Sequence, residues 1–274
     1  PSPLVKFDIA GVKVTSSRLT FRDEQGGATY AVSGLNLDTG HLANAAEGPL
    51  ELSAKVTANK PKTAADIKIS GRYRYDLAKK DYALAKLEAT VKGELPGARG
   101  LDLKLAAASL GLQPDSKAVT ADSLTLAAKG EVAGVQGLDL TLSATRLALQ
   151  PATSSVAIDK LAMAARGRHG ADAFDVKLEA PKLSLTPDKA SGEKIALTAN
   201  LTGAQKAIAA TIGLAGVEGS AKAVKIARLD LDLDAKVGET SAKGKLSSPV
   251  AVQVEATTVE LPKLAGDLDI ASPQ

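Results

Sequence analysis

Apolar and polar residues alternate along most of this chain. From Leu101 onward the apolar positions are 101, 103, 105 and 107, while Asp102 and Lys104 lie between them. A period of two is typical of a strand with one buried and one solvated face. Clusters of Gly, Pro and charged residues separate the alternating stretches, and none has the spacing of a long amphipathic helix. The pattern therefore predicts an all-β protein.

The strand pattern repeats every 36 to 37 residues in the middle of the chain. Gly-Leu-Asp-Leu-Lys-Leu at 100–105 returns as Gly-Leu-Asp-Leu-Thr-Leu at 137–142, and then as Ala-Phe-Asp-Val-Lys-Leu at 173–178. Each unit has room for two antiparallel strands of about 12 to 14 residues, roughly 40–45 Å long. A fixed period indicates stacked units that are covered only by their neighbours. We expect up-and-down β-hairpins added to one extended sheet.

The apolar phase slips by one residue near the middle of each strand. After Ala107, for example, the apolar positions move to Leu110 and Leu112. In the first hairpin the slip midpoints, 85.5 and 108.5, sum to 194, as do Glu94 and Gly100 at its turn. In an antiparallel hairpin the residue numbers of two directly paired residues have a constant sum (the index sum). Both strands therefore slip at the same distance from the turn. The other slips fall between Leu84 and Leu87, Val119 and Leu124, Ala144 and Leu147, Ile158 and Leu161, and Ala180 and Leu183.

These slips have two interpretations. A one-residue insertion that restores the apolar face is a β-bulge, and bulges bend sheets. Bulges stacked at one level predict a crease and an extended bent (taco-like) sheet with an apolar groove. Alternatively, each slip is a loop that divides two shorter strands.

The regularity of the repeat divides the chain into three segments of one continuous sheet. Residues 84–194 carry the regular hairpin repeats, residues 1–83 form an irregular N-terminal β segment, and residues 195–274 contain decaying repeats. No linker composition separates them. The chain begins Pro1-Ser2-Pro3 without an initiator methionine, so we expect a fragment of a longer protein.

The apolar residues are unusual in kind rather than in number. They are nearly all Leu, Ala, Val and Ile, with 3 Phe, 4 Tyr, 1 Met and no Trp. Aromatic side chains supply much of the buried area of compact cores, so this composition favours a long uniform surface. The net charge is +3 with both signs interspersed, which gives little support for nucleic-acid binding. The absence of cysteine excludes disulfides and is compatible with the cytoplasm or the periplasm.

Residues that could carry chemistry are few. His41 and His169 both lie in predicted loops, where a lone histidine is usually a solvated residue. Asp-Leu-Asp-Leu-Asp at 230–234 looks like the start of a calcium loop, but Ala235 replaces the required glycine and Ser241 the bidentate glutamate. We interpret the three aspartates as the solvated face of a strand. We therefore expect no catalytic residues, no metal and no cofactor.

The apolar stripe itself is the candidate site. A sheet with one apolar face covers it with a second sheet, by closing on itself, or with a ligand. Few aromatic residues argue against a sandwich core, whereas an acyl chain of about 14–18 carbons would gain up to roughly 11–14 kcal/mol on burial. The predicted groove residues are Leu84, Leu87, Leu101, Leu103, Leu105, Leu110, Leu112, Leu124, Leu126, Leu138, Leu140, Leu142, Leu147, Leu149, Phe174, Val176, Leu178, Leu183 and Leu185.

Five short stretches carry a family resemblance. They are 17–24, 30–37, 49–52, 83–88 and 93–97, which read SRLTFRDE, YAVSGLNL, PLEL, ALAKLE and GELPG. With them the sequence resembles the AsmA family of Gram-negative bacteria, most clearly over residues 5–130. The resemblance implies an inner-membrane protein anchored by one N-terminal helix, with a long periplasmic β-structure akin to those of TamB and YhdP. It also implies a bridge-like carrier of phospholipids, related in architecture to eukaryotic chorein-type proteins.

The leading hypothesis is therefore a periplasmic groove segment that binds phospholipid acyl chains and carries them between the inner and outer membranes, supporting outer-membrane lipid homeostasis. Its partners would be lipids, the inner membrane through an anchor that this sequence lacks, and periplasmic or outer-membrane proteins. One alternative is a non-catalytic structural or interaction module, a closed sandwich or solenoid spacer with no ligand. Another is an enzyme acting on envelope glycans, against which the missing acid/base pairs argue.

Overall fold

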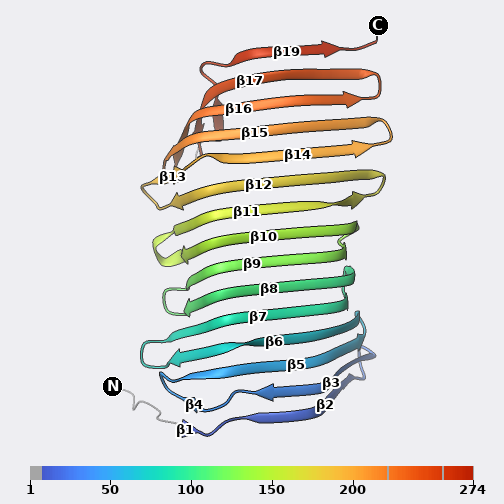
Figure 1. The fold of residues 1–274 in the computed structure, drawn as a ribbon, viewed down its shortest axis with the longest axis vertical. Helices are drawn as coiled ribbons and strands as arrows, with labels where there is room; N and C mark the ends of the chain where they lie inside the picture. Colours follow the sequence, from blue (N-terminus) through green and yellow to red (C-terminus); the bar gives the residue numbers. More distant parts are fainter. Residues whose placement is uncertain (1–7, 221, 255, 274) are drawn as a thin grey trace. The chain divides into compact units, whose positions relative to one another are not determined.

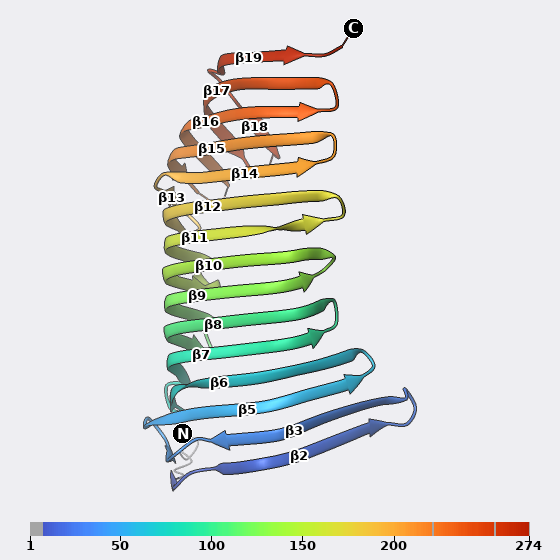
Figure 2. The ribbon, with the colours of Figure 1, turned by 45° about the vertical axis from the view of Figure 1, so that its right-hand side comes forward.

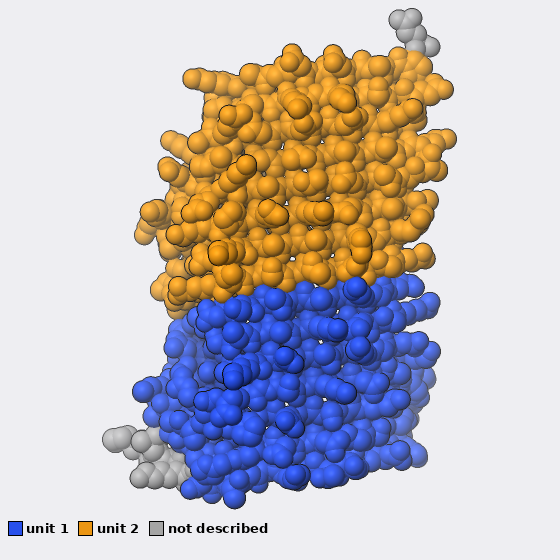
Figure 3. All heavy atoms as spheres, viewed as in Figure 1, with its two compact units in different colours: residues 1–134 blue, residues 135–274 orange. Residues whose placement is uncertain are grey.

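The computed structural model describes residues 8–273 except 221 and 255, so the start at Pro1-Ser2-Pro3 lies outside the described residues. Most of the described chain is β-strand (Figure 1), as the alternation predicts. Its one helical element is a short 3-10 turn, η1 (Pro151–Thr153). The chain divides into two compact units, residues 1–134 and residues 135–274 (Figure 3). This division reflects contacts rather than repeat regularity, so the three predicted segments stay a prediction.

Unit 1 is an antiparallel sheet whose long strands are neighbours in chain order. A separate two-stranded sheet pairs β1 (Asp8–Ile9) with β4 (Leu42–Ala43). The connections are short turns except between β3 and β5, where the chain passes through β4, so the topology is the predicted series of up-and-down hairpins. The long strands are β2 (Lys13–Asp23), β3 (Ala28–Asp38), β5 (Glu47–Asn59), β6 (Lys62–Asp76), β7 (Asp81–Leu95), β8 (Ala98–Gln113) and β9 (Ala118–Val132).

Unit 2 has the same topology, except that two short strands replace one long strand at two places in the sheet. Between β12 and β15 the short strands are β13 (Ala190–Gly192) and β14 (Ile195–Gly203). Beside β17 they are β18 (Thr258–Glu260) and β19 (Ala265–Ala271). The long strands are β10 (Val135–Gln150), β11 (Ser155–His169), β12 (Asp172–Leu185), β15 (Lys206–Gly219), β16 (Ala223–Val237) and β17 (Thr240–Gln253).

The phase slips are β-bulges inside continuous strands. In β7 and β8, Ala85 pairs with Ser109 and Leu87 with Ala107, so the index sum is 194 on both sides of the slip. Both strands therefore insert one residue at the same level. The sum of 341 predicted for the β11–β12 hairpin is also found, because Leu161 pairs with Ala180. The bulge interpretation is confirmed, and the division into separate shorter strands by loops is wrong for β7 to β12.

The bulges bend the strands of each unit along a crease, beyond which the strands turn back (Figure 2). The turn between Leu95 and Ala98 joins β7 to β8 at one end of the hairpins. We call the part of each strand on that side of the crease the long arm, and the part on the other side the short arm. Ala107, Ala144 and Ala180 lie at the crease and are only 4%, 3% and 1% exposed. Small side chains are needed there because the two arms converge.

Replacement of Ser123 by glycine should stabilise the protein. Ser123 has φ +51°, and Lys86 and Lys160, which lie 37 residues before and after it, have φ +51° and +50°. A left-handed conformation costs a non-glycine residue about 1–2 kcal/mol, so Ser123→Gly should raise the free energy of unfolding by up to about 1 kcal/mol. Ser123→Val should lower it by about 1–2 kcal/mol, because a β-branched side chain fits this conformation poorly.

Urea unfolding measures these changes, and Thr125→Gly on the same strand is the control. Thr125 is exposed and is not among the residues with positive φ, so glycine there should cost about 0.5–1 kcal/mol. Glycine lowering stability at both positions would contradict the bulge geometry.

Candidate functional site

One face of each sheet is apolar from strand to strand. Residues directly opposite each other on antiparallel strands point to the same side of the sheet. The cross-strand row in unit 1 that begins at Ile67 continues through Val91, Leu103 and Ala128. A row in unit 2 runs across seven strands through Leu142, Met163, Leu178, Leu197, Ile212, Leu231 and Leu246.

The cross-strand register and the bulges place the predicted groove residues of each unit on this apolar face. Leu87 and Leu101 are buried, at 6% and 8% exposure. Leu112 and Leu185, near the tips of the short arms, are 44% and 38% exposed. The other predicted residues are half-buried. Their position on one face is shown, and a role in lipid binding stays a prediction.

The described residues provide little cover for this face. Its large aliphatic side chains are mostly half-buried, and the described hydrophobic residues that are fully buried are ten alanines, Leu87, Leu101 and Val250. The chain exposes 17182 Å², whereas a compact monomer of 27.9 kDa exposes about 11,000 Å². Most of the leucines therefore remain accessible.

The opposite face of each sheet is polar and carries cross-strand ion pairs. Lys92 contacts Asp102 at 3.0 Å in unit 1, and Arg166 contacts Asp139 at 2.8 Å in unit 2. The 230–234 stretch lies in β16, where Asp232 and Asp234 pair with lysines of β17 at 3.1 and 2.9 Å. The hydrogen bond to Asp234 raises the pKa of Lys243. These aspartates are on a solvated strand face, as predicted.

The two histidines do not lie together. His41 is in a loop, as predicted, and its Nε2 contacts the Asp8 carboxylate. His169 is the last residue of β11 and pairs with Val135 and Asp172, so its assignment to a loop is wrong. The ladder extends to the residue before the turn there. Within the described ranges, no group of three or more His, Cys, Asp or Glu side chains is arranged to hold a metal ion.

Two tyrosines on the short arm of β6 were not predicted as part of the apolar face. Tyr73 pairs with the groove residue Leu84, and its ring stacks on that of Tyr75 with centroids 5.9 Å apart. The Tyr73 hydroxyl donates a hydrogen bond to the His41 carbonyl oxygen at 2.9 Å. Burial raises the pKa of both phenols. Their alternation with Arg72 and Arg74 was the available indication that they share the apolar side.

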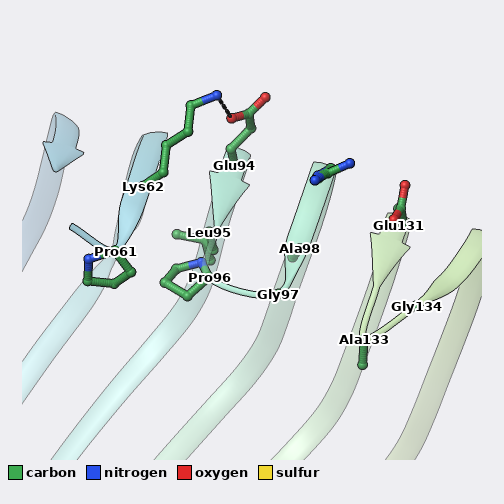
Figure 4. A pocket seen from close by; sticks show the side chains of 11 residues that line it. Pro61, Lys62, Glu94, Leu95, Pro96, Gly97, Ala98, Glu131, Ala133 and Gly134 are labelled. Carbon is green, nitrogen blue, oxygen red and sulfur yellow. Dashed lines mark ion pairs between the residues drawn. The ribbon is translucent and has the colours of Figure 1, made fainter. Parts of the chain in front are cut away.

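Hollows of the surface lie away from the predicted residues. One of about 600 Å³ lies beside the turns of the long arms in unit 1 (Figure 4), where Lys62 contacts Glu94 at 3.0 Å next to Pro96. Two more, of about 600 and 760 Å³, are lined largely by polar residues such as Ser53 and Lys68. A fourth, of about 240 Å³, contains Asp139 and Arg166. None of the predicted groove residues lines these four hollows.

No protein-family model, curated protein or solved structure matches this chain. Among the described residues, no helix has the length and apolar character needed to cross a membrane. The resemblance to the AsmA family is therefore untested by these comparisons.

Proposed function

We propose that this chain is a periplasmic groove segment of an AsmA-like protein that binds phospholipid acyl chains and carries them between the inner and outer membranes. One observation carries the proposal. The large side chains of a continuous apolar face stay partly exposed in each unit, while the ion pairs lie on the other face. Such a face favours a hydrocarbon ligand that needs no specific polar contact.

The size of the face suits acyl chains. The described part of unit 1 has seven strands in its main sheet, and six spacings of about 4.8 Å give roughly 29 Å across them. The hydrocarbon core of a bilayer is about 30 Å thick, so one acyl chain occupies about 15 Å. Chains lying along the crease would therefore each cross about three strands. Each buried methylene contributes about 0.8 kcal/mol, which suffices to hold a lipid without headgroup contacts.

Purification of the chain tests this proposal. Phospholipid should co-purify with it, because an exposed aliphatic face of this size recruits acyl chains from the cell. Native mass spectrometry would detect adducts of phospholipid mass, and solvent extraction would identify them. The same sample after delipidation should bind a hydrophobic dye and lose that binding when phospholipid is restored.

The alternative is a ligand-free structural or interaction module whose apolar face another protein covers. It predicts a lipid-free chain of oligomeric mass, with no dye binding. That result would remove the main support for lipid transport. Location in the periplasm, the inner-membrane anchor and protein partners belong to the same proposal.

A further inference from the structure

The β2 end of unit 1 exposes aromatic and aliphatic side chains that its own sheet does not cover. Leu19 is 67% exposed, Phe21 62% and Tyr30 41%. The Phe21 and Tyr30 rings lie 6.3 Å apart across the β2–β3 pair. Because aromatic and large aliphatic side chains are costly to leave in water, this cluster suits an apolar surface outside the chain.

Cations without carboxylate partners accompany the cluster. Arg18 and Arg22 are the sequence neighbours of Leu19 and Phe21, and Arg22 points to the other side of β2. Lys60 lies beside Tyr30, whose hydroxyl donates a hydrogen bond to the Lys60 carbonyl oxygen at 3.1 Å. Within the described ranges, none of these three cations forms an ion pair. They are therefore available to an anionic partner.

The β19 end of unit 2 has the opposite chemistry. Leu268 and Ile270 are 47% and 65% exposed, so this end is also apolar. Their neighbours are Asp267 and Asp269, however, and β19 has no basic or aromatic residue. An anionic surface would repel this strand, which makes it a matched control for the β2 end.

We propose that the β2–β3 hairpin docks on an anionic phospholipid bilayer. Leu19 and Phe21 enter the acyl region, Tyr30 lies at the interface, and the unpaired arginines contact lipid phosphates. Asp23 at the end of β2 and Glu24 in the following turn oppose docking by the turn itself, which leaves the strand as the contact.

This proposal does not depend on acyl-chain binding by the apolar face. Vesicle binding is measured without lipid transfer, and lipid extraction is measured without vesicles, so the two proposals fail separately. The proposed partner of the β2–β3 hairpin is a lipid bilayer. If its partner were instead a soluble protein, vesicle binding would be undetectable.

Sedimentation of the chain with vesicles tests the docking. Wild-type protein should bind phosphatidylglycerol–phosphatidylcholine vesicles and release at high salt, and it should bind pure phosphatidylcholine weakly. R18Q/R22Q should weaken binding to the anionic vesicles by about 25-fold, from about fivefold for each cation. L19S/F21S should weaken it by about tenfold or more, since the apolar area that inserts is lost.

The control variant is L268S/I270S, which changes exposed aliphatic residues beside aspartates and should bind like the wild type. Circular dichroism melting checks that all variants fold, and R18Q/R22Q keeps the test decisive if L19S/F21S is unstable. Equal binding to neutral and anionic vesicles, wild-type binding by R18Q/R22Q, or loss of binding in L268S/I270S would overturn the proposal.

Discussion

Aspartate in place of Leu140 should remove lipid from the apolar face of unit 2 while the protein stays folded. Leu140 lies on the long arm of β10, opposite Ala165, and is half-buried. A carboxylate within hydrocarbon costs about 2.5–3.5 kcal/mol, so lipid affinity should fall about 100-fold at this site. Because unit 1 keeps its own face, L103D/L140D should lose lipid from both units. Native mass spectrometry counts the lipids bound per chain.

Thr141→Asp is the matched control for Leu140→Asp. Thr141 is the next residue, is exposed and points to the polar face near Asp139 and Arg166. The Thr141→Asp variant should keep the lipid content and the thermal unfolding of the wild type. If Leu140→Asp instead unfolds the protein while Thr141→Asp does not, the apolar face is a packed core and the ligand-free module is favoured.

Alanine in place of Gly93 should destabilise the fold by about 2–4 kcal/mol. Gly93 has φ +134°, and a Cβ atom there would overlap the Ala64 carbonyl oxygen of the neighbouring strand. A backbone atom in a ladder moves only if the ladder breaks. The urea midpoint of unfolding measures the loss.

The same repeat position offers two graded controls. Gly130 also has φ +134°, but its Cβ would lie 2.8 Å from the carbonyl oxygens of Arg99 and Gly100, so alanine should cost less there. Gly167 is not among the residues with positive φ, and the closest atom to its Cβ, 2.7 Å away, is a methyl carbon of the Val135 side chain rather than backbone, so the cost should be the smallest of the three. If alanine lowered the free energy of unfolding equally at all three positions, the close approach of the neighbouring backbone would not be the cause of the loss.

Gly93 also marks a limit of the sequence analysis. We expected Glu94 to pair with Gly100 because the index sum of 194 was extended to the turn. The pairing shifts there, and Leu95 faces Ala98 instead, so that expectation is wrong. A second bulge lies near the turn, where glycine conformation sets the register. It changes no apolar parity that the sequence analysis used, and so it left no visible slip.

The predictable features follow from local geometry. The alternation of apolar and polar residues follows from the pleat of a strand, and the 37-residue spacing follows from the length of a hairpin. The slip near Lys86 indicates an inserted residue, since a one-residue shift moves every side chain to the other face. These three patterns placed residues as distant as Leu84 and Leu185 on the apolar faces of their sheets. The break at Glu193 and Lys194, which separates β13 from β14, left no such pattern.

The sequence by itself determined the strands, their hairpin order, the crease and the side of the sheet on which each leucine lies, because each follows from spacing along one strand or hairpin. Only the tertiary structure decided how far that side is covered. Coverage depends on residues distant in sequence, and the described ones leave an apolar face with buried alanines at its crease and partly exposed leucines on its arms. The tertiary structure also brought Tyr73 to His41 and Phe21 to Tyr30. Those contacts arise from the pairing and crossing of strands, which no single strand pattern encodes.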